Sequence, residues 1–247
     1  MNHVWAGLAC RAQGTRLYGK PLQLVGDRPI VEHLIAHLRR LRSLEGIGLA
    51  VSEGAENEVF VEMAKRLGLP WVVGDVKDVL GRLLKLANHV GAEHLLRITT
   101  ENPFMSLHGA DELIAEHVRS GADYSTIPYL PDGVGFEMIR VESLKISHAE
   151  GQPRHRSELV SSYIYDHQDR FKILRIDPPA KLRRPDIRLT VDYPEDLILC
   201  RRIYDALHRE GELIDVEAII DFIDAHPEVR AITDSISVDW GHGRLWE

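Results

Sequence analysis

The stretch VWAGLACRAQGTRLYGKPL, residues 4–22, decides the fold, because an apolar run passes directly into a loop rich in glycines and cations. Val4 to Cys10 has the composition of a buried strand. The loop after it carries Arg11, Arg16 and Lys20 together with two glycines. Glycine lets backbone N–H groups turn toward an anion, and fixed cations neutralise charge on phosphate oxygens. The stretch therefore predicts a phosphate-binding loop, and the alternative is a surface turn with solvated arginines.

Two widespread glycine loops are excluded by spacing. Gly14 precedes Lys20 by six residues and Pro21 follows the lysine, so the pattern G-x-x-x-x-G-K-[ST] is absent. No G-x-G-x-x-G follows the strand either. The loop must hold its anion in another way.

Composition limits the class of protein. With 247 residues the chain can bury the core of a single α/β domain, 1–247. A net charge of −8 argues against binding to nucleic acid or to an anionic membrane surface, where cationic neutralisation dominates. Cys10 and Cys200 lie far apart in apolar surroundings, which indicates reduced thiols. No run is long enough to span a bilayer and no signal segment opens the chain, so we expect a cytoplasmic protein.

Strand-like runs alternate with helical ones, which predicts an α/β fold with a mainly parallel sheet flanked by helices. From 123 to 186 this pattern loosens into short strand signals. The predicted strands are Val4–Cys10, Ile47–Ser52, Trp71–Val73, Leu95–Thr99 and Leu189–Val191. The predicted helices are Ile30–Leu41, Glu58–Leu67, Val76–Val90, Ala110–Arg119, Glu195–His208 and Val216–Ala225.

The segment RITTENPF places a carboxylate, Glu101, at the end of a predicted strand. Ligands of open α/β sheets bind beyond the carboxyl ends of the strands, so this side chain is expected to face the same cleft as the first loop. Mg²⁺ prefers oxygen ligands and often shares them with substrate phosphates. Glu101 is therefore a candidate metal ligand, and the alternative is a turn or N-cap carboxylate before Asn102-Pro103.

A second carboxylate comes from RLTVDYPEDL, residues 188–197, where Asp192 follows a strand-like run. Pro194 at a first helical position, with Glu195 and Asp196 in the first turn, fits the start of a helix. Asp192 is accordingly a candidate metal ligand or an N-cap, and the two roles are compatible. We assign Glu195 and Asp196 to the helix dipole.

The order Arg, Gly-Thr-Arg-Leu, Gly-Lys-Pro-Leu in the first loop resembles the signature of the sugar-acid cytidylyltransferases, in the branch of spore coat polysaccharide biosynthesis protein F. That signature reads A-R-x-x-S-x-R-L-P-G-K-x-L, so Thr15 and Tyr18 stand where serine and proline are usual. RITTENP is similar to the family's R-[IV]-T-G-D-x-P, with Thr100 for glycine and Glu101 for aspartate. VDYPEDL matches V-D-T-P-E-D-L almost fully. The resemblance runs from about Leu8 to about Leu207.

Two middle segments resemble the parts of the family that handle the acceptor. Residues 132–137, DGVGFE, are similar to D-G-x-D-x-E, with Gly135 in place of an acidic residue. Residues 154–160, RHRSELV, are similar to S-x-R-E-H-V, with Leu159 in place of histidine. Arginines here could pair with a substrate carboxylate, and the alternative is a solvated basic patch.

The resemblance implies a nucleotide-diphospho-sugar transferase-like, Rossmann-like domain with a small sheet excursion near 123–186 that commonly mediates homodimers. It implies transfer of CMP from CTP to an anionic sugar acceptor with release of pyrophosphate, assisted by Mg²⁺. The implied catalytic cations are Lys20, Arg11 and Arg16. The implied nucleotide-binding residues are Leu8, Ala9, Arg11, Thr15, Lys20, Asp78, Arg82 and Arg97. The implied acceptor-binding residues are Phe136, Glu137, Arg154, Arg156 and Glu158, and the implied metal ligands are Glu101 and Asp192.

Three other functions stay open. A glycosyltransferase that uses sugar nucleotides would share the α/β plan, although such enzymes often carry Asp-x-Asp and this chain has none. A nucleotidyltransferase selective for another base is the second. A non-catalytic nucleotide-binding relative is the third, favoured by the departures at Thr100, Glu101, Gly135 and Leu159.

Overall fold

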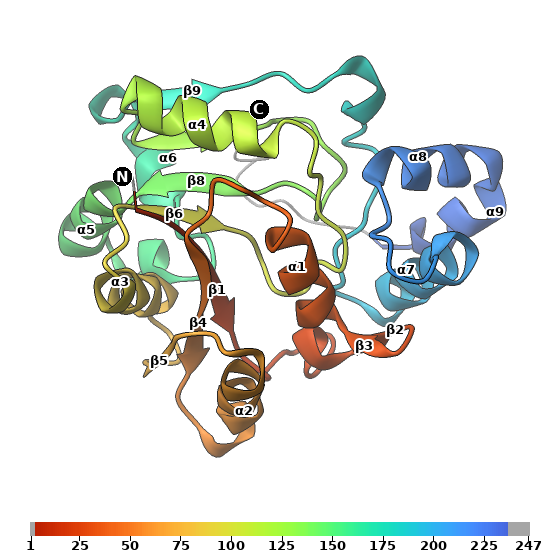
Figure 1. Ribbon diagram of the computed structural model, residues 1–247, viewed down its shortest axis with the longest axis horizontal. Coiled ribbons are helices and arrows are strands. Elements are labelled where there is room, and N and C mark those ends of the chain that lie inside the picture. The colour runs from red at the N-terminus through yellow and green to blue at the C-terminus, as the bar shows by residue number, and fades with distance from the viewer. Residues whose placement is uncertain (1–2, 237–247) are drawn as a thin grey trace.

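A seven-stranded sheet organises residues 3–236, which are the residues that the computed structural model describes (Figure 1). Its strand order is β5-β4-β1-β6-β8-β7-β9, and β8 alone runs against its neighbours in this described sheet. The strands are β1 (Val4–Cys10), β4 (Gly46–Ser52), β5 (Trp71–Gly74), β6 (His94–Arg97), β7 (Tyr124–Thr126), β8 (Glu137–Arg140) and β9 (Ile173–Arg175). The predicted α/β fold with a mainly parallel sheet is confirmed.

Helices cover both faces of the sheet, and a further group packs beside it. The helices are α1 (Ile30–Leu38), α2 (Glu58–Leu67), α3 (Val79–Val90), α4 (Ala110–Ser120), α5 (Val141–Glu150), α6 (Ser162–Asp166), α7 (Pro194–Leu207), α8 (Val216–Ala225) and α9 (Pro227–Arg230). Buried side chains of α1, α2 and α4 pack on one face, and those of α3, α5 and α6 pack on the other. Helices α7, α8 and α9, blue in Figure 1, form the group beside the sheet.

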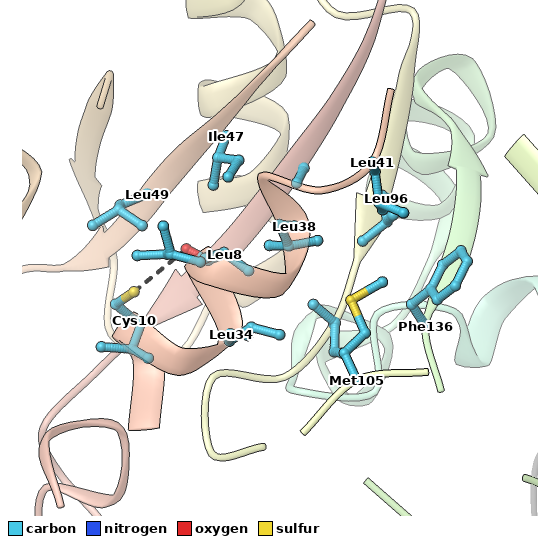
Figure 2. Packing of buried hydrophobic residues seen from close by; sticks show 14 of the residues in the cluster. Leu8, Cys10, Leu34, Leu38, Leu41, Ile47, Leu49, Leu96, Met105 and Phe136 are labelled. Carbon is cyan, nitrogen blue, oxygen red and sulfur yellow. Dashed lines mark hydrogen bonds between the residues drawn. The ribbon is translucent and has the colours of Figure 1, made fainter. Parts of the chain in front are cut away.

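Alternation along β1 explains why both faces are covered. Leu8 and Cys10 face the cluster that contains α1, whereas Trp5 and Ala9 pack against the cluster that contains α3. Figure 2 shows Leu8 among Leu34, Leu38 and Leu49, with the Cys10 thiol donating to the Leu8 carbonyl at 3.6 Å. A strand buried on both faces reads as a continuous apolar run, as the sequence of β1 does.

Most predicted elements form close to their predicted bounds, and the differences have local causes. The helix predicted from residue 76 begins at Val79, because the Asp78 carboxylate accepts a hydrogen bond from the Gly81 N–H and caps it. The helix predicted to Leu41 ends at Leu38. The predicted strand Leu189–Val191 is wrong: these residues form no strand in the described structure, and the nearest strand-like pairing is an isolated bridge between Asp132 and Arg188.

The loosely patterned region 123–186 supplies β7, β8 and β9 to the main sheet. The small separate sheet lies elsewhere, as an antiparallel pair of β2 (Leu24–Val25) and β3 (Arg28–Pro29). No helix of residues 3–236 combines the length and the apolar character needed to cross a bilayer.

Strand order reverses at β1, which has β4 on one side and β6 on the other. The chain continues from β1 toward β4 on one side and from β6 toward β8 and β7 on the other, and the loops that follow the parallel strands β1 and β6 leave the same edge of the sheet side by side. Open α/β sheets bind ligands at such a switch point. This is where Glu101 and the loop predicted to bind phosphate emerge.

Candidate functional site

Two adjoining pockets lie at the switch point. The smaller, about 60 Å³, is lined by residues such as Ala9, Arg11 and Arg82. The larger, about 290 Å³, extends between Asp192 and the 126–137 segment. Both are bounded by the same group: Lys20, Arg97, Ile98, Thr99, Glu101 and Glu158. A ligand that spans the two pockets would thus pass over Lys20 and Glu101.

Glycines shape the loop that presents Lys20. Gly19 has φ of +62°, and its N–H donates to the Ala12 carbonyl at 2.8 Å, which closes the loop. A Cβ on Gly14 would lie 2.5 Å from the Leu17 carbonyl oxygen, so no larger residue fits there without movement. Lys20 then begins a short 3₁₀ turn with its side chain mostly buried, 17% exposed.

Asp192 is surrounded by cations. Its Oδ1 accepts from Lys20 Nζ at 2.5 Å and from Arg16 at 3.1 Å, and its Oδ2 accepts from Arg188 at 3.0 Å. Burial works to raise the pKa of Asp192, but the bond from Lys20 and the three positive charges outweigh it and hold that pKa below its usual range. Asp192 is therefore a firmly ionised carboxylate. It is not the N-cap of α7, which is Tyr193.

Glu101 lies beside this cluster. The Val191 N–H donates to the Glu101 carbonyl at 3.2 Å, which holds the loop after β6 against the segment that carries Asp192. Burial raises the pKa of Glu101, Lys20 opposes the shift and the negative charge of Asp192 adds to it. The carboxylates of Glu101 and Asp192 are thus close enough for the charge of Asp192 to raise the pKa of Glu101.

Arg188 anchors the Asp192 segment from behind. It donates to Asp196 at 2.8 Å and 3.0 Å and to Asp132 at 3.0 Å, in addition to Asp192. Asp196 is 1% exposed, and its Oδ2 also accepts from the N–H groups of Asp192 and Tyr193, both at 2.9 Å. The assignment of Asp196 to the helix dipole therefore understates its role, because this carboxylate fixes the backbone that presents Asp192.

A polar network forms the wall of the larger pocket. Glu137 accepts from Arg97 at 3.2 Å, from the Tyr124 hydroxyl at 2.8 Å and from the Ser161 hydroxyl at 2.7 Å. Arg97 also donates to the Glu158 carbonyl at 2.6 Å. This network joins β6, β7 and β8 to residues 158–161. Burial raises the pKa of Tyr124, so this phenol stays protonated as a donor.

Glu158 lines both pockets and connects residues 158–161 to the loop after β1. Its carboxylate accepts from Arg11 of the phosphate loop at 2.7 Å, and both side chains are exposed. Phe136, which is buried, and Glu158 line the larger pocket with Glu137. Three of the predicted acceptor-binding residues are thus brought together.

Not every predicted nucleotide-binding residue reaches the pockets. Ala9 and Arg82 line the smaller one, where the Arg82 guanidinium is held by the carbonyls of Asp75 and Val76. Three other residues line neither of these two pockets: Leu8, Thr15 and Asp78. Leu8 is fully buried in the core, and Asp78 caps α3 while pairing with His148 at 2.7 Å.

Neither pocket is lined by the basic cluster proposed for the acceptor, Arg154 and Arg156. Arg154 pairs with Asp166 at 2.7 Å, and Arg156 donates to the His148 carbonyl at 3.0 Å near the end of α5. Neither arginine lines the larger pocket, whose cations are Arg16, Lys20 and Arg97. Within the described residues, Arg154 and Arg156 each have a partner in the scaffold, and their role toward an acceptor stays a prediction.

Mg²⁺ could be held by Glu101 and Asp192, whose carboxylate oxygens are the donors it prefers. Residues 3–236 contain no group of three or more His, Cys, Asp or Glu side chains arranged to hold a metal. The two carboxylates fit a divalent ion only if phosphates and water supply its remaining ligands. They also require Lys20 and Arg16 to leave Asp192 Oδ1.

Sequence reasoning missed Arg188 and Tyr129, and it placed Asp132 in an acceptor segment without its ion pair to Arg188. Arg188 and Asp192 are four residues apart, with Asp196 four residues further, and this spacing of charges was the available signal. Nothing local in the sequence pairs Arg188 with Asp132, since the two are far apart in the chain.

Known proteins resemble this chain in sequence and in fold. The family model for cytidylyltransferases matches residues 8–222. The chain is 26% identical over 235 residues to the Bacillus subtilis spore coat polysaccharide biosynthesis protein SpsF, covering 92% of this chain and 97% of that protein. A cytidylyltransferase from Leptospira borgpetersenii has the same fold, with a TM-score of 0.82, 18% identity and coverage of 96% and 98%. CMP:2-keto-3-deoxy-manno-octonic acid synthetase complexed with CTP gives a TM-score of 0.59 and 12% identity, with coverage of 83% and 99%.

Proposed function

Because the chain belongs to the cytidylyltransferase family, we propose that it transfers CMP from CTP to a hydroxyl group of a sugar or sugar acid and releases pyrophosphate. Activated sugars of this kind would serve surface polysaccharide synthesis, as the similarity to SpsF supports. The observation that carries the proposal is the position of Lys20 and Glu101 at the junction of two pockets, with Asp192 in the larger pocket bonded to Lys20. One pocket is available for a nucleotide and the other for an acceptor.

The reaction needs in-line attack at phosphorus. The acceptor oxygen forms a bond to the α-phosphorus of CTP, the bond from that phosphorus to the bridging oxygen of the β-phosphate breaks, and pyrophosphate carries the electron pair away. The acceptor hydroxyl loses its proton to solvent or to a neighbouring carboxylate. The protein contributes mainly positioning and charge stabilisation.

Lys20 and Arg16 are the cations that meet the phosphates. Both are bound to Asp192 Oδ1, so they are already aimed at the floor of the cleft. A triphosphate offers them more negative charge than one carboxylate, and they exchange Asp192 for phosphate oxygens. The release of Asp192 Oδ1 makes this carboxylate available, with Glu101, to a divalent ion. Mg²⁺, when bound, would neutralise charge on the phosphate oxygens.

Arg11 closes the same end of the cleft through its ion pair with Glu158. Both side chains are exposed and the pair is readily exchanged for ligand contacts, because surface ion pairs contribute little net stability. Arg82 stiffens the smaller pocket by binding the carbonyls that precede α3. These residues border the nucleotide in the proposal.

We propose an acceptor with an acidic group, which would meet Arg97, because Arg97 is the cation of the larger pocket that is not assigned to the phosphates. The CTP-bound synthetase with the same fold is named after such a sugar acid.

A cytoplasmic homodimer is the proposed state of the protein. Light scattering of the purified chain tests the dimer, and a monomer mass would exclude it.

Pyrophosphate release tests the proposal. The chain is incubated with Mg²⁺, one of CTP, UTP, ATP and GTP, and a panel of sugar acids and neutral sugars. We expect release with CTP and a sugar acid, loss of release in Lys20→Ala, and full release in the matched control Lys145→Ala, whose lysine pairs with Glu142 on α5. Pyrophosphate release with another nucleotide but not with CTP would contradict the proposed preference for cytidine. No release with any pair of nucleotide and acceptor would indicate a non-catalytic relative.

A further inference from the structure

Tyr129 has a backbone conformation that its side chain disfavours. Its φ is +62°, and it is the one residue other than glycine with a positive φ in residues 3–236. Turns that need such a φ after a proline normally take glycine or asparagine, and here Pro128 precedes a bulky aromatic residue. Strain of this kind persists where the surroundings enforce it, and it concentrates at sites of function.

The segment around Tyr129 is held rigidly. Asp132 receives a hydrogen bond at its carbonyl from the Leu189 N–H at 2.7 Å and donates its own N–H to the Ile187 carbonyl at 2.8 Å. A Cβ on Gly133 would lie 2.5 Å from the Thr190 nitrogen, so the two backbones are in direct contact. The scaffold therefore fixes the backbone at Asp132 and Gly133, three and four residues after Tyr129.

The ring of Tyr129 is also clamped. The Arg183 guanidinium lies over it, 4.4 Å from the ring centroid, and Arg183 is itself held by Asp177 at 2.7 Å. A cation over the ring face is attracted by the negative face of the π-system. The aromatic side chain is thus fixed from one side while it lines the larger pocket.

A second feature of this pocket indicates a polar ligand. Asn102, 3% exposed, also lines it, and its side-chain oxygen has no hydrogen-bond partner within residues 3–236. Its amide nitrogen donates to the Thr99 hydroxyl at 2.7 Å. A buried amide with an unpaired end is costly unless a ligand completes it, and a sugar hydroxyl can donate to it.

We propose that Tyr129 is a specificity-determining residue that receives the acceptor of the proposed reaction, on which this inference rests. A pyranose has an apolar C–H face and a rim of hydroxyl groups. Tyr129 presents an apolar ring with a hydroxyl at its tip, a combination that matches such a ligand. Arg183 acts as a positioning residue, and Asn102 meets a hydroxyl group of the same sugar.

The test combines kinetics with stability. Tyr129→Gly removes the ring and relieves the backbone, so we expect an unchanged or higher Tm, an unchanged KM for CTP and a KM for the acceptor raised at least 10-fold. Tyr129→Phe keeps the ring and should change the acceptor KM less. Arg183→Gln should raise the acceptor KM by a smaller factor than Tyr129→Gly, and Arg39→Gln, an exposed arginine at the end of α1, is the matched control.

Two outcomes overturn this inference while the proposed function stands: an unchanged acceptor KM in Tyr129→Gly, or a clear loss of Tm in that variant with equal effects on both substrates. If the wild type releases no pyrophosphate, the proposed function fails, and a measurement of sugar binding then tests the role of Tyr129. Saturation-transfer NMR with 2-keto-3-deoxy-manno-octonic acid and N-acetylneuraminic acid as probes should then show signals that Tyr129→Gly loses. Equal signals in both proteins, or none in the wild type, would overturn it.

Discussion

Loss of the Asp196 carboxylate should lower the free energy of unfolding of the protein and also slow its reaction. Asp196 accepts two bonds from Arg188 and two from the backbone N–H groups of Asp192 and Tyr193. It is 1% exposed, so water cannot replace it without rearrangement. Asp196→Ala leaves Arg188 buried with fewer partners and leaves two N–H groups unpaired.

The expected loss follows from these partners. Removing one member of a buried ion pair costs about 3–5 kcal/mol, because the other charge stays desolvated. Asp132 and Asp192 still hold Arg188, so the lower end of this range, about 3 kcal/mol, is expected for the free energy of unfolding. A domain of this size loses about 2–4 °C in Tm for each kcal/mol, which predicts a Tm lower by about 6–12 °C. Turnover should fall about 10–100-fold, as when a partner that orients a ligand-binding group is lost.

Glu195→Ala is the matched control, since Glu195 lies in the same first turn of α7 and makes no ion pair or side-chain hydrogen bond within residues 3–236. It should cost about 0.3–1 kcal/mol. Urea unfolding gives both free energies, and pyrophosphate release gives both rates. Equal small losses in the two variants would refute the role of Asp196 as the residue that fixes the Asp192 segment.

Three further predictions concern charge. Lys20→Ala should lower pyrophosphate release by about 10²–10³-fold with an unchanged circular dichroism spectrum, because the lysine balances charge that grows on the phosphates; near wild-type release would exclude the loop from catalysis. Glu101→Ala should cost about 10²-fold, Glu101→Asp should also impair the reaction, and chelation of Mg²⁺ should abolish it; a metal-dependent enzyme with a fully active Glu101→Ala variant would remove Glu101 from the site. Burial, with the charge of His94, lowers the pKa of His117 in the folded protein from 6.5 to about 3. As the pH drops below 6.5, His117 of the unfolded chain is protonated while His117 of the folded protein stays neutral, so the free energy of unfolding falls. The free energy of unfolding should fall by about 2 kcal/mol between pH 7.5 and 5 from this group alone, and the fall should be smaller in His117→Gln; equal slopes would contradict it.

The order of elements up to α4 was predictable because the central strands β1 and β4 are buried on both faces, whereas β7, β8 and β9 appeared in the sequence only as short strand signals. Val4–Cys10 could be assigned from its apolar run alone, and the loop after it from its glycines and cations. The end of Ile30–Leu38 and the start of Val79–Val90 could not, because caps and local hydrogen bonds set such ends. The run Leu189–Val191 reads as a strand but makes no ladder, since its neighbour on one side is the irregular 129–133 segment.

Of the candidate site, the parts next to the sheet were predictable and the parts held by distant partners were not. Lys20, Glu101 and Asp192 meet because they follow strands or strand-like runs at one edge. Arg154 and Arg156 looked like an acceptor site by charge, yet Asp166 and the end of α5 bind them. The sequence shows the charge of a side chain, but it does not show which partner from a distant part of the chain the fold places beside it.

One measurement tests the central claim most directly: ³¹P NMR of CTP, Mg²⁺ and a sugar-acid acceptor turned over by the chain. Attack by the acceptor oxygen on the α-phosphorus predicts that the three CTP signals decline together while pyrophosphate and one phosphodiester signal grow in equal amounts. The same sample with Lys20→Ala should keep its CTP. Growth of inorganic phosphate and CDP, without a phosphodiester, would contradict the account, because it would place the broken bond at the γ-phosphate.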